Sequence, residues 1–408
     1  MLSLINSTII PKVLSSKSLE TGQTWVNGTL NAVSSAELKM KPEVPQSYPH
    51  QSDITTKSPL LIDTDVHNYT RSIDDLMPYL SERWKSYIVQ GGFKTPGVSM
   101  YPKMYSQAAR RDAIPYEGGI AGSEPEFAKE QLLDHWEIKY GILNPLIGVP
   151  QIKNLDLGRA LMRAVNDWTQ AIWLDSDPRW LGSILIHPSD PEGSAEEILR
   201  LADDNRFVQI LLMARSSAPY GKQHMDPIYK AACEAGLPIG IHFGGGGDVP
   251  ITAVGWPSYY IEDHTGMVQA FESQVISLVC EGTFVKFPEL RIVLIEGGFA
   301  WLPALMWRLD KNYRGLRDEV PWLKKLPSEY IIEHFRATTQ PMEEPPNVHY
   351  LLQILDMIGS DDFLMFATDY PHWDFDAPNQ AIPSVITGKL RERIMWKNAA
   401  TLYKLSTT

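Results

Sequence analysis

The feature of this sequence that most constrains its fold is a series of short apolar runs separated by longer amphipathic segments. A strand in a parallel sheet is covered on both faces, so it reads as a nearly continuous run of β-branched and other apolar residues. Eight candidate strands of this kind lie at residues 60–67, 140–146, 181–188, 207–214, 237–245, 290–298, 334–341 and 363–372. The segments between and after them predict helices at residues 124–137, 157–176, 193–204, 226–235, 264–285, 301–319, 348–358 and 389–405. This alternation predicts an α/β fold built from strand–helix units.

Two architectures can be built from such units, a closed (β/α)8 TIM barrel and a doubly wound open sheet. An open sheet normally has a glycine-rich phosphate-binding loop after its first strand, and none follows residues 60–67. The four glycines at 244–247 follow the fifth strand and lack the Lys-Ser/Thr of a phosphate loop, so they predict only a permissive turn. We therefore predict a TIM barrel over residues 59–408. Residues 1–58 are rich in Ser, Thr, Asn and Pro and predict an irregular N-terminal extension, disordered alone or wrapped around a partner subunit.

The charge and the cysteines of the chain exclude several classes of protein. The formal net charge is -12 at pH 7 and the isoelectric point is near 5.3, which disfavours nucleic acid or an anionic membrane surface as a partner. No apolar run approaches the length of a membrane span, and no basic segment precedes the apolar residues at the N-terminus. Cys233 and Cys280 have no metal-binding or disulfide spacing, so they predict core thiols in a reducing compartment. These features predict a cytoplasmic protein.

Ionisable residues cluster where several predicted strands end. An ionisable group in the last positions of a barrel strand is costly unless it acts at the mouth of the barrel. Strand one ends with Asp63, Asp65 and His67 at alternate positions, which places all three on one face of the strand. The later strands contribute His242, Glu296, Asp369 and His372. Imidazoles and carboxylates without thiolates suit a divalent ion such as Zn²⁺, Mn²⁺ or Fe²⁺, so the joint pattern predicts a metal site.

Other polar residues near strand ends have an ordinary structural interpretation beside a functional one. His187 at the end of strand three can touch substrate or metal, although a lone histidine there is more often a hydrogen-bonded structural residue. Arg215, at the end of strand four, can bind a substrate carboxylate or form a surface ion pair. His264 and Glu262 precede a helix, so helix capping is the default for them. Asp63 can cap a turn or orient a metal-binding histidine. The candidate substrate-binding residues are His187, Arg215, His264 and His372.

Five sequence motifs resemble those of a known family, and together they extend over about residues 59–405. IDTDVHNY, GIHFGG, FPELRIVLIEGG, FATDYPHWD and the terminal NAATLYKL resemble the amidohydrolase-2 branch of the amidohydrolase superfamily, the branch of aminocarboxymuconate semialdehyde decarboxylase-like enzymes. The resemblance implies metal ligation by Asp65, His67, His242 and Asp369, with Asp369 also able to accept a proton from metal-bound water. The chain departs from the family at the end of strand six, where the usual His-Gly-Gly is Glu296-Gly297-Gly298. A carboxylate at this position can bind metal or act as a base.

The leading hypothesis is a metal-dependent hydrolase or decarboxylase that acts on a small carboxylic acid through metal-activated water. Zinc is the first choice of metal, and manganese or iron, as one or two ions, suits the carboxylates of Asp65 and Glu296. Asp369 or Glu296 is expected to move the proton. Some relatives in the branch use a dinuclear Fe/Mn site to activate oxygen and act as two related chains together, so an oxygenase is an alternative. A non-catalytic barrel subunit that supports an active partner is another, and either a homo-oligomer or a hetero-oligomer with a related chain is expected.

Overall fold

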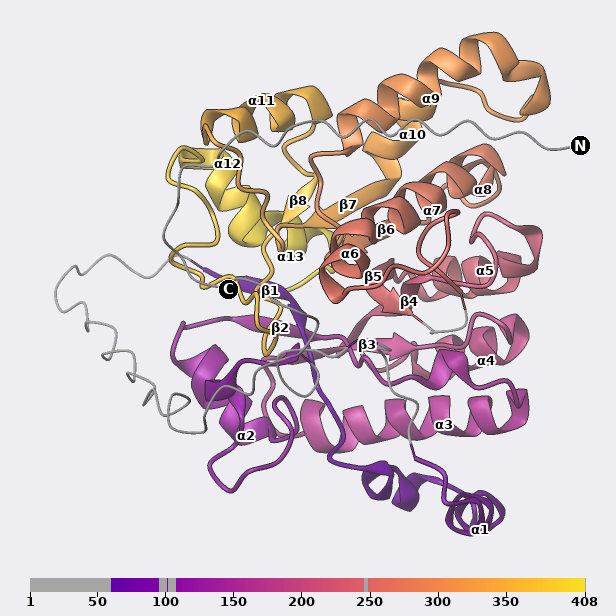
Figure 1. Cartoon of the computed structure of the whole chain (residues 1–408), viewed down its shortest axis with the longest axis vertical. Coiled ribbons are helices and arrows are strands. Elements are labelled where there is room, and N and C mark those ends of the chain that lie inside the picture. Colours follow the sequence, from indigo (N-terminus) through magenta and orange to yellow (C-terminus); the bar gives the residue numbers. More distant parts are fainter. Residues whose placement is uncertain (1–59, 95–100, 102–107, 246–248, 408) are drawn as a thin grey trace, which may run out of the picture. The chain divides into compact units, whose positions relative to one another are not determined.

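The computed structural model describes residues 60–94, 101, 108–245 and 249–407, and the predicted extension at residues 1–58 lies outside these ranges. All eight predicted strands are present, and they form one parallel sheet in the order of the sequence (Figure 1). The strands are β1 (Ile62–Val66), β2 (Tyr140–Leu143), β3 (Trp180–Leu185), β4 (Phe207–Arg215), β5 (Ile239–Gly245), β6 (Ile292–Ile295), β7 (Phe335–Thr338) and β8 (Leu364–Met365). This order excludes a doubly wound sheet, in which the strand order reverses at one point.

The sheet closes on itself through the segment that follows β8. The backbone N–H of Thr64 in β1 donates to the carbonyl of Phe366 over 3.0 Å, and the N–H of His67 donates to the carbonyl of Tyr370 over 2.7 Å. In the other direction, the N–H of Asp369 donates to the carbonyl of Asp65 over 3.1 Å. These bonds join the last strand to the first, as a (β/α)8 barrel requires, so the predicted TIM barrel is confirmed.

Helices surround the strands, with α3 and α4 beside β3 and with α9 and α11 on the side of the late strands (Figure 1). Seven of the eight predicted helical segments match within three residues, when the π-helical turns Lys129–Asp134, Thr169–Leu174 and Arg393–Lys397, which continue α2, α3 and α12, are included. The bounds of the helices are α1 (Glu82–Gly91), α2 (Pro125–Ala128), α3 (Leu155–Trp168), α4 (Pro191–Leu201), α5 (Asp226–Ala235), α6 (Tyr260–Gly266), α7 (Val268–Cys280), α8 (Thr283–Lys286), α9 (Leu302–Leu316), α10 (Pro327–His334), α11 (His349–Ile358), α12 (Gly388–Glu392) and α13 (Asn398–Leu402). Helices α1 and α10 were not predicted. Both lie within long connections that also carry loops, so the strand–helix alternation does not require them.

The single helix predicted at 264–285 is wrong in detail, because the structure has three helices there, α6, α7 and α8. Gly282 separates α7 from α8 with a left-handed φ of +72°. A Cβ at this position would lie 2.4 Å from Cδ1 of Trp322, so the close approach of the indole also requires glycine. The apolar spacing continues across Gly282, which is why the pattern reads as one long helix.

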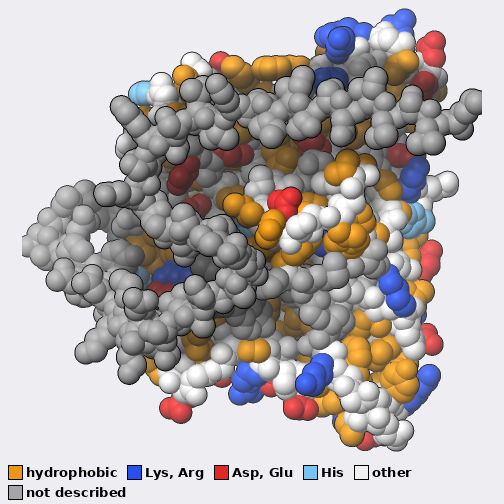
Figure 2. All heavy atoms as spheres, in the orientation of Figure 1, with side chains coloured by type: hydrophobic (Ala, Val, Ile, Leu, Met, Phe, Trp, Pro, Cys, Tyr) orange, Lys and Arg blue, Asp and Glu red, His pale blue; other side chains and the backbone are white. Residues whose placement is uncertain are grey.

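Gly244 and Gly245 were predicted to lie in a turn after the fifth strand, but they are the last two residues of β5, with φ values of +108° and +125°, and Gly246 and Gly247 lie outside the described residues. A Cβ on Gly245 would lie 2.4 Å from the carbonyl oxygen of Arg215, so glycine lets the end of β5 approach the end of β4. No helix in the described ranges is both long and apolar enough to cross a membrane. On the face shown in Figure 2, the described Lys and Arg side chains lie at several separated places, most of them near the edge.

Candidate metal centre

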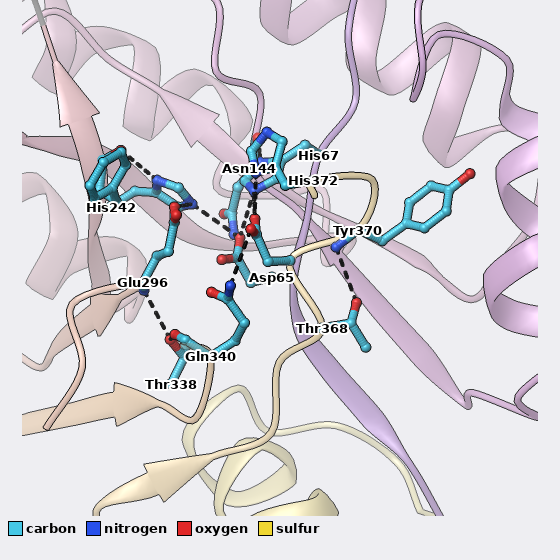
Figure 3. Close-up of polar contacts among 12 residues, drawn as sticks. Asp65, His67, Asn144, His242, Glu296, Thr338, Gln340, Thr368, Tyr370 and His372 are labelled. Carbon is cyan, nitrogen blue, oxygen red and sulfur yellow. Dashed lines mark hydrogen bonds and ion pairs between the residues drawn. The ribbon is translucent and has the colours of Figure 1, made fainter. Parts of the chain in front are cut away.

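Five of the predicted residues meet at the carboxyl ends of the barrel strands. Their ligand atoms all lie within 4.8 Å of one another, and each side chain is buried. We call this group the first cluster, and its members are Asp65, His67, His242, Glu296 and Asp369. Figure 3 shows His67 over Asp65 near the centre, with His242 and Glu296 extending toward Asp65 from β5 and from the end of β6. The convergence places two imidazoles and three carboxylates around one point, which is the donor set of a divalent metal site.

Both histidines of the first cluster are oriented by backbone carbonyl groups. Nδ1 of His67 lies 2.8 Å from the carbonyl oxygen of Asn144, and Nδ1 of His242 lies 2.7 Å from the carbonyl oxygen of Phe243. A carbonyl can only accept, so Nδ1 donates in each case and Nε2 faces the cluster. A metal-binding histidine is held in this way, with its second nitrogen donating to a fixed acceptor.

The distances between acceptor atoms in the cluster fit a shared cation. Nε2 of His67 lies 2.8 Å from Oδ1 of Asp369 and 3.4 Å from Oδ1 of Asp65, and Nε2 of His242 lies 3.2 Å from that same Asp65 oxygen. Ligands bound to one ion at ~2.1 Å and at right angles lie about 3 Å apart. Oδ2 of Asp65 and Oε2 of Glu296 are buried without a hydrogen-bond partner, which a bound cation would correct. The residues therefore fit a divalent ion.

The burial of so many ionisable groups shifts their pKa values in the metal-free protein. Burial lowers the pKa of His67 to about 4, so this imidazole is neutral and suited to bind a metal. Burial is the largest single effect on His242 and opposes its charged form, but the charge and hydrogen bond of Asp65 together with the charge of Glu296 outweigh burial and raise the pKa of His242 to about 9. Burial, together with the charges of Glu296 and Asp374, raises the pKa of Asp369 well above its ordinary value. A cation would relieve this repulsion among the carboxylates.

The backbone is strained at two of the carboxylates. Glu296 and Asp369 have φ values of +58° and +61°, in the left-handed region that residues other than glycine rarely adopt. The hydroxyl of Thr338 in β7 accepts the N–H of Glu296 over 3.0 Å and holds this conformation. The two strained residues are the ones that come from the turns after β6 and β8, and strain of this kind concentrates at functional sites.

Asn144, at the end of β2, orients two of the proposed ligands at once. Its side-chain amide donates to Oδ1 of Asp65 over 2.8 Å, and its backbone carbonyl accepts from Nδ1 of His67. The amide oxygen of Asn144 in turn accepts from the hydroxyl of Ser183 over 2.6 Å and from Nε2 of Gln209 over 2.9 Å. The hydroxyl of Tyr403 lies 3.0 Å from Oε1 of Gln209. A buried hydrogen-bond network in the barrel interior therefore fixes the positions of the ligands from behind.

Asp63 points to the turn that carries Asp369 and does not join the cluster. Its carboxylate accepts from the hydroxyl of Thr368 over 2.6 Å and from the N–H of Thr368 over 3.0 Å. Burial raises the pKa of Asp63 to about 7. The predicted turn-capping role of Asp63 thus agrees with its contacts, and the capped turn is the one that positions Asp369.

His372 links Asp369 to the pocket beside the cluster. Its Nδ1 lies 2.6 Å from Oδ1 of Asp369, and its Nε2 lies 2.8 Å from the hydroxyl of Tyr69. The ring of His372 stacks on the ring of His67 with 4.4 Å between the centroids (Figure 3). The pocket is lined by Tyr69 and His372 together with Arg215, Phe243, Glu296 and Trp373. A small molecule in this pocket therefore lies against both the first cluster and the Asp369–His372–Tyr69 chain.

The remaining predicted residues lie in different surroundings. Arg215 lines the pocket, and it is buried in an ion pair of 2.7 Å with Asp263, not in a surface pair. His264 lies within α6, where Nε2 is 3.6 Å from Oε1 of Glu296. Glu262 caps the same helix by accepting the N–H of Tyr259 over 2.9 Å. His187 does not join the cluster, because its Nε2 is bonded to the carbonyl of Ile152 over 2.9 Å.

Four residues of the site were missed in the sequence, namely Tyr69, Asn144, Gln340 and Asp374. Asn144 and Gln340 end the runs YGILN and RATTQ, so the rule that located the acids would have found them if amides had been included. Nε2 of Gln340 donates to Oδ2 of Asp374 over 3.1 Å and to Oδ2 of Asp369 over 3.3 Å. Tyr69 and Asp374 lie beyond strand ends in connecting segments, where no periodicity marks them.

Comparisons with known proteins agree with this geometry. A family model described as amidohydrolase matches residues 62–405. None of the curated proteins is significantly similar to the chain.

Several solved structures share the fold at low sequence identity. The 5-carboxyvanillate decarboxylase of Sphingomonas paucimobilis is 21% identical with a TM-score of 0.59, and the match covers 86% of this chain and 100% of that one. The 2,6-dihydroxybenzoate decarboxylase from Rhizobium is 19% identical with a TM-score of 0.62, covering 85% and 99%. A dihydroxybenzoic acid decarboxylase from a Polaromonas species, solved with manganese and the inhibitor 2-nitroresorcinol, is 21% identical with a TM-score of 0.62, covering 86% and 98%.

Proposed function

Because this chain belongs to the amidohydrolase family, we propose that it is a metal-dependent decarboxylase of a small aromatic carboxylic acid. The observation that carries the proposal is the first cluster, in which two carbonyl-oriented imidazoles and three carboxylates converge beside a pocket. The similarity in fold to aromatic acid decarboxylases supports this reaction over hydrolysis. Manganese is the metal we favour, because the first cluster has three carboxylates and one of the similar structures binds manganese.

The pocket combines the two features that an aromatic acid needs. Phe243 and Trp373 supply aromatic surfaces for a ring, and Arg215 supplies a cation for an anionic group. Nε of Arg215 is buried without a hydrogen-bond partner, while another nitrogen of the same guanidinium bonds to Asp263. Asp263 therefore holds the guanidinium in place, and the unpartnered N–H remains for the substrate.

Asp65, His67, His242, Glu296 and Asp369 are the proposed ligands of the ion. When bound there, a divalent ion polarises the carboxylate of the substrate and lowers the pKa of a bound water. The carbonyl groups that accept from Nδ1 of His67 and His242 keep Nε2 available for the metal. The hydrogen bond that Asn144 donates to Asp65 and the one that the backbone N–H of Glu296 donates to Thr338 keep the two acids at their positions without substrate.

Decarboxylation replaces the leaving carbon dioxide with a proton, so the site needs an acid near the reacting carbon. Burial raises the pKa of Tyr69, so its hydroxyl keeps its proton. Tyr69, His372 and Asp369 form a continuous hydrogen-bonded chain that begins at the pocket wall. We assign Asp369 as the group that delivers the proton, and His372 with Tyr69 as the path that restores it.

The test is an assay of carbon dioxide release from a panel of small aromatic hydroxy acids. Metal-free protein reconstituted with Mn²⁺ is expected to release carbon dioxide from at least one acid, and Asp369→Asn is expected to lose this activity while it keeps its fold. His349→Ala, which changes an exposed histidine at the start of α11, is the matched control. Hydrolysis of ester or lactone substrates without release of carbon dioxide, or equal turnover by metal-free protein, would contradict the proposal.

A further inference from the structure

A second cavity lies at the opposite end of the barrel from the metal centre. It has a volume of about 410 Å³ and is formed by residues at the amino-terminal ends of β5, β6, β7 and β8 together with α5 and α13. We call it the basal cavity, and three of its lining residues are positively charged, namely Arg291, Arg336 and Lys404. We propose that the basal cavity binds the phosphate group of a small molecule through these three side chains. The inference goes beyond the proposed function, because none of the three belongs to the first cluster or lines the pocket beside it.

The two arginines of the basal cavity extend from the same face of neighbouring strands. In the parallel pairing of β6 with β7, Arg336 lies opposite Val293. Arg291 precedes Val293 by two residues, and its carbonyl accepts the N–H of Ile239 in β5 over 2.9 Å, so it continues the extended strand. Side chains two residues apart lie on one face of a strand, which places Arg291 beside Arg336. Burial lowers the pKa of Arg336, and the charge of Arg291 adds to this effect while the charge of Asp362 opposes it.

Each of the two guanidinium groups is held by the backbone through one nitrogen, and its other nitrogens have no partner. Nη1 of Arg291 donates to two backbone carbonyl groups, each over 3.0 Å, and Nη1 of Arg336 donates to two others, over 2.7 Å and 3.3 Å. Within the described ranges, neither arginine forms an ion pair, and neither Nε nor Nη2 of either one forms a hydrogen bond. By contrast, Arg179, Arg200 and Arg206 each pair with two carboxylates. A guanidinium with a fixed Nη1 and a free Nε and Nη2 can donate two parallel hydrogen bonds to an oxyanion.

Lys404 adds a third positive charge to the basal cavity. Its Nζ lies 3.4 Å from the carbonyl oxygen of Gly236, and it forms no ion pair with any residue that the structure describes. The cavity also contains two acids, Glu289 and Asp362, but Asp362 is paired with Arg393. The three cations therefore outnumber the acids in a chain whose net charge is -12, and their mutual repulsion would be offset by a bound anion.

The charge and the lining of the basal cavity favour a phosphate ester over a carboxylate. A phosphate monoester carries about -1.5 to -2 charges at pH 7 and has three strong acceptor oxygens. These numbers match two guanidinium groups and one ammonium group better than the single charge and two oxygens of a carboxylate do. Leu237, Pro238 and Leu402 supply an apolar wall for the remainder of the molecule.

The experiment is isothermal titration calorimetry of the full chain with inorganic phosphate and with glycerol 2-phosphate, in parallel on manganese-loaded and on metal-free protein. We expect one phosphate group per chain with a dissociation constant below about 1 mM in both forms. Arg291→Gln and Arg336→Gln are each expected to weaken binding by about 10–100-fold, since each removes charge-assisted hydrogen bonds. Lys404→Gln, which changes an exposed side chain, is expected to weaken binding by about 2–5-fold. Arg314→Gln, which removes an exposed charge on α9, is the matched control and should bind as the wild type does.

Tighter binding of the ester than of inorganic phosphate would identify a phosphorylated small molecule as the ligand, and the reverse order would identify the free ion. A wild-type protein that binds neither probe would overturn the basal site. Binding that disappears when manganese is removed would also overturn it, because the anion would then lie at the metal centre. If Arg336→Gln fails to fold, equal affinities of the wild type, Arg291→Gln and Lys404→Gln would refute the proposal by themselves.

Discussion

The two clusters that share Glu296 are built in different ways. In the first, Asp65, His67 and His242 come from barrel strands or the residue directly after one, and all are fully buried. The second cluster consists of His264, Glu296 and Asp374, whose ligand atoms also lie within 4.8 Å of one another; His264 comes from the short helix α6 and Asp374 from the loop after β8, and the side chains of both are partly exposed. The contrast indicates that the first cluster is held more rigidly by the barrel than the second, whose side chains are more accessible.

The groups that orient the side chains also differ between the two clusters, and the first cluster is again the more tightly held. Carbonyl groups orient the histidines of the first cluster, and the amide of Asn144 orients Asp65. In the second cluster, Gln340 orients Asp374, and His264 packs against aromatic rings such as Phe243. We therefore expect changes to the first cluster and its supports to have the larger effects, and changes near the pocket to act mainly on substrate binding.

The largest effect is expected for His67→Ala, because His67 contributes a neutral imidazole to the centre of the first cluster. The variant should lose the tightly bound metal, and kcat should fall by at least about 1000-fold, since the bound ion supplies several kcal/mol of stabilisation to the transition state. Elemental analysis and turnover measure the two effects. His135→Ala, which changes an exposed histidine outside the cluster, is the control. A His67→Ala protein that retains full metal content would contradict the assignment.

The next effect is expected for Asn144→Leu, which removes the hydrogen bond from the side-chain amide to Asp65 while keeping a similar volume. Loss of such a partner typically weakens metal binding by about 10–100-fold. Competition with a chelator measures the affinity, and thermal unfolding measures the stability. Asn166→Leu is a matched control, since Asn166 is also buried but bonds to Leu185 and Glu197. If both variants lose stability and only Asn144→Leu loses metal affinity, the positioning role of Asn144 is supported. Equal metal affinities in Asn144→Leu and Asn166→Leu would refute this role.

A smaller effect, on substrate binding alone, is expected for Arg215→Leu. Loss of a charge-assisted hydrogen bond costs about 1.5–3 kcal/mol, so KM should rise by about 10–100-fold while bound metal remains unchanged. Arg215→Lys should recover only part of the affinity, because a lysine lacks the planar guanidinium. Arg159→Leu, which removes a half-exposed partner of Asp190, should leave KM unaltered. A loss confined to kcat would place Arg215 outside the substrate-binding surface.

The smallest effect is expected for Tyr403→Phe, at the outer end of the network behind the first cluster. The change removes one buried hydroxyl that bonds to Gln209, which should lower the free energy of unfolding by about 1 kcal/mol. Metal content and KM should stay as in the wild type, because Gln209 still donates to Asn144. Denaturant unfolding and a metal titration check both statements. A large loss of metal would show that the network transmits strain further than we expect.

The strand pattern predicted much of the first cluster, and the reason is geometric. Carboxyl ends of parallel barrel strands meet at one mouth, so acids and histidines at those ends must be neighbours once the barrel closes. That argument selected Asp65, His67, His242, Glu296 and Asp369 together. It also selected His187, whose ring turns instead toward Ile152, because a strand-end position does not fix the direction of a side chain.

The sequence by itself determined the eightfold alternation and the residues at its strand ends, since apolar periodicity and residue type are local properties of the chain. Only the tertiary structure decided that Asn144 and Gln340 orient the ligands, that Arg215 is paired inside the pocket, and that Glu296 lies between two clusters. These relations join residues from distant strands and loops. Such contacts depend on side-chain directions and loop paths that no local pattern contains.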